Sequence, residues 1–215
     1  MLKEAGLPDG VLNIVQGEGQ TGADLTKHPD VSKVTFTGSV PTGAKIMKSA
    51  ADGIRNVTLE LGGKSPLIIF DDADLKNAVK GALMANFFTQ GQVCSNAARV
   101  FVQRGIYLEF LEAFVTQAKR MKIGDPFAEE TTVGATICED HANKVLGYVE
   151  SAISEGAKVE CGGKRVMLEG KCLRWFFSES AMKNESHFLK KKPPLKILCK
   201  YHFIENSIMS WRHNS

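Results

Sequence analysis

The sequence predicts an α/β fold, in which helices cover a parallel sheet. From residue 11 onward, short runs of β-branched or apolar residues alternate with longer amphipathic stretches, which is the pattern of strands joined by helices. Within residues 75–90, Leu75, Val79, Leu83 and Phe87 recur at every fourth position. This spacing places them in one apolar stripe, the face with which a helix packs on a sheet.

The individual elements follow from the same periodicities, taken in chain order. Strands are expected at residues 11–15, 31–37, 57–61, 66–70 and 99–103. Helices are expected at residues 42–51, 75–90, 106–121 and 141–155. After residue 163 we find no sustained period, and we expect an irregular tail there.

Composition bounds the class of protein. The chain has 215 residues, of which 43% are hydrophobic and 24% charged, as in ordinary globular domains. The longest apolar runs, such as residues 67–70, are far shorter than the roughly 20 residues of a membrane-spanning helix. The N-terminus lacks the pattern of a secretory signal, and five cysteines at irregular spacing indicate free thiols. We therefore expect a cytoplasmic protein that does not enter a membrane.

A compositional break follows Gly163. Residues 164–215 carry 11 Lys or Arg but only 4 Asp or Glu, although the whole chain has a formal charge of +3, and 19 of the 20 glycines precede the break. We interpret residues 164–215 as an unrelated basic segment, poorly ordered, joined to a differently built one. Its lysines lack the arrangement of a nucleic-acid-binding module, so no nucleic-acid partner is expected.

Two glycine-rich turns are candidates for binding a nucleotide. Residues 17–22 (GEGQTG) match the dinucleotide-binding pattern, but no acidic residue stands about 20 positions later to bind the ribose, which favours a plain turn. A second turn comprises Gly38, Ser39, Val40, Pro41, Thr42 and Gly43. It follows a predicted strand and opens a predicted helix, whose N–H groups suit a phosphate. Spacing alone favours a phosphate site and a simple connection equally.

Cys94 and Glu60 are the residues best suited to catalysis. Cys94 lies between small and amide residues at the exit of the 75–90 helix, where a substrate can approach the sulfur, although most cysteines are inert and buried. Glu60 ends an apolar strand, a position that suits a general base, although a salt bridge is the commoner role. Four metal-binding side chains, at Cys161, Cys172, His187 and Cys199, have spacings that match no compact zinc pattern, so no metal is expected.

Taken together, three motifs resemble those of the aldehyde dehydrogenase superfamily. They are residues 36–39 (FTGS), residues 57–66 (VTLELGGKSP) and residues 91–94 (GQVC), in the order of that family. The resemblance runs from about residue 2 to residue 163. Residues 40–43 and 81–87 are similar to the subgroup that oxidises 4-trimethylaminobutyraldehyde and betaine aldehyde.

The resemblance implies a partial aldehyde dehydrogenase fold and a set of residue roles. Residues 1–62 would be part of an NAD-binding domain and residues 63–163 part of the catalytic domain. Cys94 would be the nucleophile that attacks a small aldehyde, and Glu60 the base that activates water, which requires both side chains to face a common pocket. Residues 38–43, with Leu61 and Gly62, would contact the cofactor, which we expect to be NAD. Family members are expected to be homo-oligomers.

The sequence also departs from the family pattern. The upstream half of the family's cofactor domain and the segments after residue 163 have no counterpart here, so we expect impaired activity from a truncated chain. Two alternatives remain open. One is a non-catalytic fragment that associates with full-length subunits, and the other is a thiol-dependent esterase that uses Cys94 and Glu60 without NAD.

Overall fold

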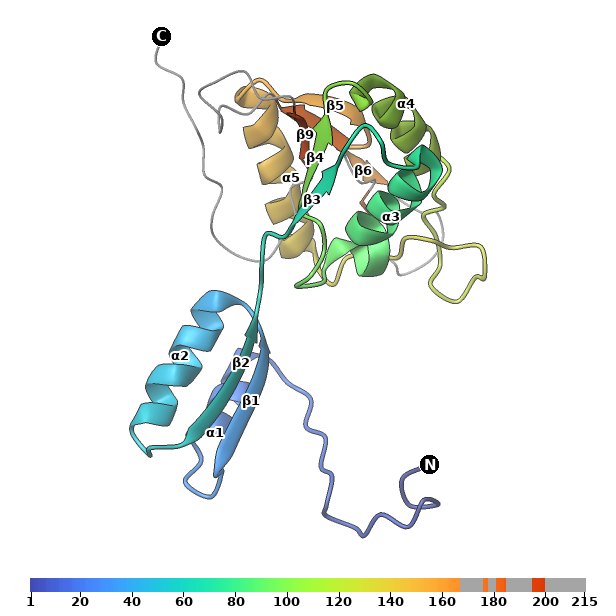
Figure 1. Cartoon of the computed structure of the whole chain (residues 1–215). Coiled ribbons are helices and arrows are strands. Elements are labelled where there is room, and N and C mark those ends of the chain that lie inside the picture. The colour runs from blue at the N-terminus through green and yellow to red at the C-terminus, as the bar shows by residue number, and fades with distance from the viewer. Residues whose placement is uncertain (167–175, 178–180, 185–194, 200–215) are drawn as a thin grey trace. The chain divides into compact units, whose positions relative to one another are not determined.

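The computed structural model describes residues 1–166, 176–177, 181–184 and 195–199, and it confirms the predicted α/β class. The chain forms two compact units, Met1–Leu61 and Gly62–Ser215. Each unit contains a parallel strand pair whose strands are connected through a helix (Figure 1). Within the described residues, no helix combines the length and apolar character needed to cross a membrane.

The first unit contains two helices and a two-stranded sheet (Figure 1). Its elements are α1 (Gly19–Lys27), β1 (Lys33–Gly38), α2 (Val40–Ala51) and β2 (Asn56–Leu61). The strands pair in parallel, from Lys33 opposite Asn56 to Gly38 opposite Leu61. Helix α2 packs against both strands and against α1. Val34, Ile46 and Ala50 are the buried apolar side chains there.

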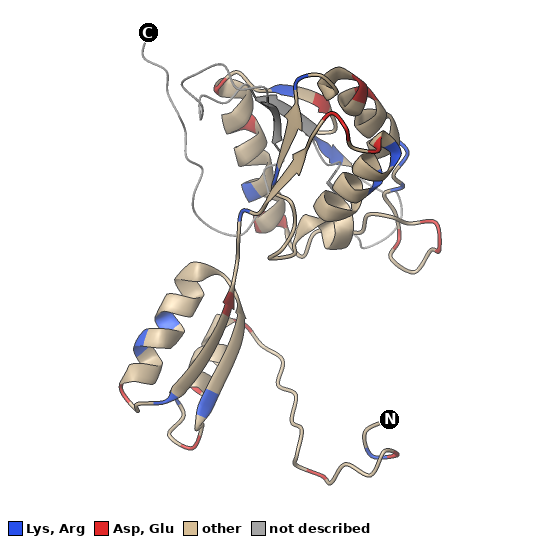
Figure 2. Cartoon of the chain, viewed as in Figure 1, with Lys and Arg blue, Asp and Glu red and all other residues tan. Residues whose placement is uncertain are grey.

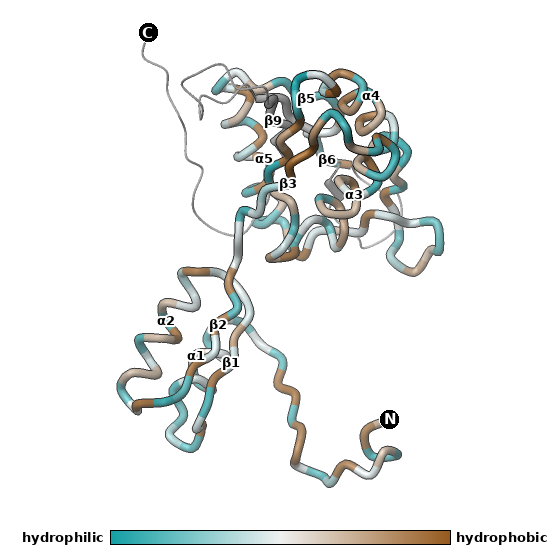
Figure 3. Tube along the Cα trace, in the orientation of Figure 1, coloured by the Kyte–Doolittle hydropathy of each residue, from teal (hydrophilic) through white to brown (hydrophobic). Residues whose placement is uncertain are grey.

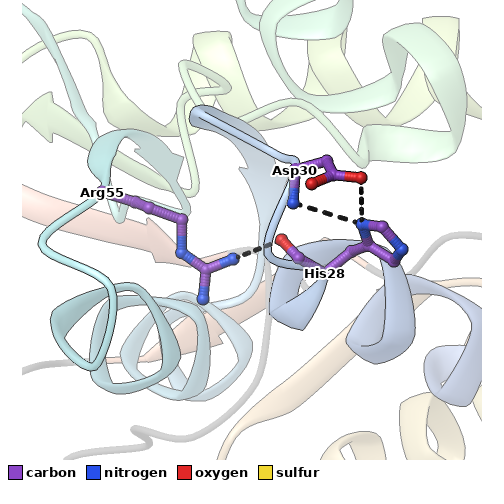
Figure 4. Close-up of polar contacts among 3 residues, drawn as sticks. All are labelled: His28, Asp30 and Arg55. Atoms are coloured by element: carbon purple, nitrogen blue, oxygen red, sulfur yellow. Dashed lines mark hydrogen bonds and ion pairs between the residues drawn. The ribbon is translucent and has the colours of Figure 1, made fainter.

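Arg55 joins three elements of the first unit, and Figure 4 shows its contact with His28. Its guanidinium donates to the carbonyl of His28, just after α1, and to the carbonyl of Ser49 in α2, each at 3.0 Å. The His28 Nδ1 accepts the Asp30 N–H at 3.3 Å and lies 3.9 Å from the Asp30 carboxylate. These contacts fix the ends of α1 and α2 beside the start of β2.

The second unit is built on a five-stranded sheet in the order β3-β4-β9-β8-β5. Strands β3 (Pro66–Ile69) and β4 (Arg99–Gln103) are parallel, and β9 (Leu195–Cys199), β8 (Ala181–Asn184) and β5 (Lys158–Cys161) continue the sheet with antiparallel pairings. A separate pair joins β6 (Arg165–Val166) to β7 (Phe176–Phe177). The helices are α3 (Leu75–Phe87), a 3-10 turn η1 (Phe88–Gly91), α4 (Tyr107–Ala118) and α5 (Glu139–Ser154).

The core of the second unit lies between β3, β4, α3 and α4. Strands β3 and β4 are rich in hydrophobic residues (Figure 3), and Val100 and Val102 of β4 are fully buried. The predicted stripe of α3 is confirmed, because Val79 and Phe87 are buried in this core while Leu75 and Leu83 pack at its margin. The Phe114 ring of α4 stacks on the Phe87 and Phe110 rings, with centroids 5.8 and 5.7 Å away.

Acidic residues gather in the connection between β3 and α3, at Asp71, Asp72 and Asp74 (Figure 2). Asp74 begins α3, because its carboxylate accepts the Asn77 N–H at 2.7 Å. Asp71 is fixed to the end of β4 by Gln103, whose amide nitrogen donates to the Asp71 carboxylate at 2.6 Å. These contacts account for the sharp start of the helix that leads to Cys94.

Two expectations for individual elements were wrong, and two elements before residue 163 were missed. Residues 11–15 form no strand, and Val11, Ile14 and Val15 are 60% to 76% exposed. In the described part of the chain no strand pairs with them, and an extended segment without a partner leaves its backbone unpaired. Helix α1 and strand β5 were not predicted. The helix expected to reach residue 90 ends at Phe87, because the backbone then turns into the left-handed region.

Short strands also occur where the sequence showed no period. Strands β6 to β9 all lie after Gly163 and contain two to five residues each, too few to give a clear alternation. Apart from Lys164 and these short strands, residues 164–215 lie outside the described residues. The expectation that this segment is poorly ordered falls on those positions.

Candidate functional site

Cys94 lies in a loop that follows α3 and begins with an unusual turn. Thr89, Gln90 and Gly91 have φ values of 52°, 51° and 73°, the left-handed region that β-branched residues avoid most strongly. The Gln92 N–H closes the turn on the Thr89 carbonyl at 2.9 Å. Beyond it, the Cys94 thiol is exposed, so a small molecule can reach the sulfur.

The end of this loop, residues 96–98, is buried and is hydrogen-bonded to α3. The Ala97 N–H donates to the Ala85 carbonyl at 2.9 Å, and the Asn96 N–H donates to the Val93 carbonyl at 3.1 Å. Asn96 is only 7% exposed, and Ala97 and Ala98 are also buried. An exposed sulfur is therefore carried by a backbone that is anchored to α3 at Ala97, three residues later.

Two buried amides near Cys94 were not singled out from the sequence. Asn86, 1% exposed, donates from its side-chain nitrogen to the Ala82 carbonyl at 2.8 Å within the last turns of α3. Asn96, 7% exposed, follows Cys94 by two residues. The sequence does contain a signal for Asn86, because this polar residue immediately precedes Phe87 of the apolar stripe.

Gly63 lies against the Cys94 backbone within the second unit. A Cβ atom added at Gly63 would stand 3.1 Å from the Cys94 carbonyl oxygen, closer than ordinary van der Waals contact. The next residue, Lys64, has its carbonyl held by Arg99, whose Nε and Nη2 donate at 3.0 and 2.6 Å. Burial, and secondly the positive charge of Arg99, lower the pKa of the Lys64 ammonium. The Gly63 approach and the Arg99 hydrogen bonds hold the segment before β3 beside the Cys94 loop.

Glu60 belongs to the first unit. It is an exposed residue of β2 and stands opposite Thr37 of β1 in the parallel ladder. Its neighbour Leu61 points toward α2, where a Cβ added at Gly43 would stand 2.7 Å from the Leu61 Cδ2. Cys94 and Glu60 lie in different units, so the expectation that they share a pocket stays a prediction.

The second glycine turn connects β1 to α2, as its sequence indicates. Ser39 is the N-cap of α2, where its hydroxyl oxygen accepts the Thr42 N–H at 3.3 Å, and Pro41 occupies the first turn. The Ser39 hydroxyl also donates to the Thr42 hydroxyl at 2.9 Å. No acidic residue lies in the first turn of α2, so this helix N-terminus is electrostatically suited to an anion. The cofactor contacts of residues 38–43, Leu61 and Gly62 stay predictions.

The first glycine-rich stretch takes a different position. Gly19 and Gly22 lie inside α1, whose N-cap is Glu18, and no strand precedes it in the described part of the chain. The strand, glycine turn and helix of a dinucleotide site are therefore incomplete at residues 17–22. Among the described residues, no group of three or more His, Cys, Asp or Glu side chains is placed to hold a metal. Cys172 and His187 lie outside those residues.

Comparison with known proteins identifies the family. The model of the aldehyde dehydrogenase family matches residues 1–180. The chain belongs to the aldehyde dehydrogenase family. This match extends beyond residue 163, and it includes Cys94, Glu60 and the 38–43 turn.

Individual aldehyde dehydrogenases agree with the resemblance read from the motifs. The 4-trimethylaminobutyraldehyde dehydrogenase of Homo sapiens is 62% identical over 160 residues, covering 74% of this chain and 32% of that protein. An NAD+ complex of the Bacillus cereus aldehyde dehydrogenase has a TM-score of 0.78 at 42% identity, with 84% of this chain and 36% of that chain covered.

The betaine aldehyde dehydrogenase of Staphylococcus aureus, also in complex with NAD+, has a TM-score of 0.77 at 40% identity, covering 84% and 36% of the two chains. These relatives confirm the predicted family, the predicted subgroup and the partial fold. The chain spans about a third of the length of the relatives that it matches.

Proposed function

We propose that this chain takes part in the NAD-dependent oxidation of an aldehyde to a carboxylic acid, with Cys94 as the nucleophile. The observation that carries the proposal is an exposed thiol on an anchored loop, within the region that matches the aldehyde dehydrogenase family. Relatives named for 4-trimethylaminobutyraldehyde and betaine aldehyde support a small aldehyde carrying a quaternary ammonium group as the substrate.

The first step belongs to Cys94. Its thiolate attacks the aldehyde carbon, because the thiol itself is a poor nucleophile, and a thiohemiacetal forms. The Cys94 backbone N–H stabilises part of the negative charge on the oxygen. NAD, when bound, supplies the acceptor for the hydride that leaves this carbon. Cys94 then holds the acyl group as a thioester.

Glu60 acts in the second step. Its carboxylate takes a proton from water, and the resulting hydroxide attacks the thioester carbon, which releases the carboxylic acid and restores the Cys94 thiolate. An exposed carboxylate at the end of β2 is accessible to that water. In this scheme residues 1–62 contribute the cofactor-binding part, and residues 63–163 contribute the part that carries the nucleophile.

The residues that would hold NAD are those of the 38–43 turn, with Leu61 and Gly62. The fit rests on the exposed N-terminus of α2, with its Ser39 cap and no acidic residue in its first turn, which suits the negative pyrophosphate. Gly43 is buried against Leu61, so α2 lies close to the end of β2. This close packing supports a cofactor surface formed by both segments.

The decisive experiment measures NADH formation by the purified chain with a trimethylammonium aldehyde and NAD+. Cys94→Ala should abolish it, a loss of about 1,000-fold or more. Glu60→Gln should slow turnover by about 100 to 10,000-fold and leave an initial burst, because the thioester forms but is hydrolysed slowly. NADH formation that is unchanged in Cys94→Ala would refute the proposed nucleophile.

A second arm tests the thiol chemistry without NAD. An activated acetyl ester should acylate Cys94, as shown by peptide mass spectrometry, and Cys138, which is also exposed, is the internal reference. Ester turnover without any aldehyde oxidation would favour the thiol-dependent esterase instead. Acylation of Cys138 as fast as that of Cys94 would contradict both activities.

A further inference from the structure

The loop that carries Cys94 is held on two sides in the second unit. On one side, the Ala97 N–H donates to the Ala85 carbonyl of α3, and the Asn96 N–H donates to the Val93 carbonyl. On the other side, Gly63 lies beside the Cys94 carbonyl, because a Cβ atom added at Gly63 would stand 3.1 Å from that oxygen. Real Cβ atoms rarely approach an oxygen so closely, so a side chain at residue 63 requires one of the two segments to move.

The backbone that follows Gly63 is restrained by hydrogen bonds. Arg99 donates twice to the carbonyl of Lys64, and its own N–H donates to the Ser65 carbonyl at 3.3 Å. Directly beyond, β3 pairs with β4 from Pro66 onward. The backbone after Gly63 is thereby attached to a strand whose Val100 and Val102 are buried in the core.

The Cys94 loop is restrained at its other end as well. The left-handed turn at residues 89–91 leaves Gly91 buried. The Gln90 side-chain amide lies against Gly134, where an added Cβ would stand 3.0 Å from the Gln90 Nε2. The part of the loop that is free to yield is therefore the short exposed stretch around Cys94.

We propose that Gly63 is a positioning residue for Cys94: because Gly63 has no side chain, the segment before β3 fixes the carbonyl, and hence the Cα, of the nucleophile. This role rests on the proposed function, in which Cys94 is the nucleophile. Gly63 acts through the Cys94 backbone, without touching the substrate. A methyl group at residue 63 moves Cys94 and strains the two hydrogen bonds that follow it.

The test is amide hydrogen exchange of the full chain, resolved by peptide. In Gly63→Ala, exchange at residues 94–98 should be about tenfold faster, as expected for a local strain of ordinary size, while exchange in β4 and α4 is unchanged. The matched control is Gly81→Ala in α3, because a Cβ at Gly81 meets nothing within 4 Å. That variant should leave exchange at residues 94–98 unchanged.

A chemical readout accompanies the exchange. The ratio of the Cys94 to the Cys138 alkylation rate, measured across pH, should change about threefold or more in Gly63→Ala, because the surroundings that set thiol reactivity change at Cys94 alone. Uniformly faster exchange throughout the second unit, or unchanged exchange at residues 94–98, overturns the proposal. Exchange does not depend on catalysis, so an inactive chain with this exchange pattern contradicts only the proposed function.

If Gly63→Ala does not fold, Arg99→Lys tests the same contact from the other side. Arg99 is exposed, and the change keeps its charge but removes the paired donors to the Lys64 carbonyl. Loss of these paired hydrogen bonds should also raise amide exchange at residues 94–98, again relative to exchange in α4. Exchange at residues 94–98 that matches the native chain in this variant overturns the proposal.

Discussion

At the start of α2, the Ser39 hydroxyl oxygen accepts the Thr42 N–H. Ser39→Ala should destabilise the first unit by about 1 kcal/mol, because it removes the N-cap. Ser39→Asp keeps a capping oxygen and should restore that loss. Its negative charge, however, stands where the pyrophosphate is proposed, and should weaken NAD binding about tenfold. Urea denaturation measures the first effect and titration calorimetry the second, and equal NAD binding by Ser39→Asp and the native chain would exclude this turn from the cofactor site.

Thr89 shows which part of the candidate site the sequence could predict and which it could not. The motif at residues 91–94 identified Cys94, and the stripe of α3 placed it after a helix. No periodicity revealed that Thr89 and Gln90 take left-handed backbone conformations. The loop that contains this turn is anchored by the hydrogen bond from Ala97 to Ala85. These residues are well separated in the sequence, so local periodicity does not reveal their contact.

This turn makes a prediction of its own. Thr89 is exposed, and its φ of 52° is unfavourable for a β-branched side chain. Thr89→Asn should stabilise the second unit by about 0.5 to 1 kcal/mol, because Asn tolerates the left-handed region. Thr89→Val retains the β-branch and is the matched control, which should not stabilise. If denaturant midpoints show the two variants equally stable, the turn is not strained.

Among the elements, those that pack on a neighbour were predicted most accurately. The strands later found as β1 to β4, and helices α2 to α5, all follow from residues whose period matches a buried face, such as Val79 and Phe87. The wrong strand at residues 11–15 had the right residue types but no strand beside it in the described part of the chain. Helix α1 was missed because none of its residues is buried, so it carries no core-facing stripe.

Helix α5 should make the stability of the second unit depend on pH. Burial, and secondly the charge of Lys144, lower the pKa of His141 from its ordinary value of 6.5. The unfolded chain therefore binds more protons at this position than the folded chain between the folded pKa and 6.5. The corresponding stability is fully present above pH 6.5 and is lost as the pH falls through the folded pKa.

The Tm of the native chain should accordingly fall on acidification below pH 6.5, and His141→Gln should fall less. Glu139 and Asp140 in the first turn of α5 favour the charged histidine, and Lys144 opposes it. Lys144→Gln should therefore give an intermediate dependence. Parallel Tm profiles for the native chain and His141→Gln would show that another group controls the acid response.

For the whole molecule, the two units differ strongly in the core that each one buries. The first unit buries Val34, Ile46 and Ala50 around a two-stranded sheet, and such a small sheet is only marginally stable by itself. The second unit has a large core that includes stacked Phe110 and Phe114. We therefore expect two unfolding transitions, with the first unit unfolding at the lower denaturant concentration.

Matched core truncations test this order. Ile46→Ala should lower only the first transition, by about 2 to 4 kcal/mol, and Phe110→Ala only the second, by about 3 to 5 kcal/mol, because each leaves a cavity in one core. Amide exchange in β1 and in β4 reports the two units separately. If either substitution shifts both transitions equally, the units unfold as one cooperative structure. In that case β1 and β2 would gain their stability from the larger core, and the Ser39 and Thr89 effects would no longer be confined to their own units.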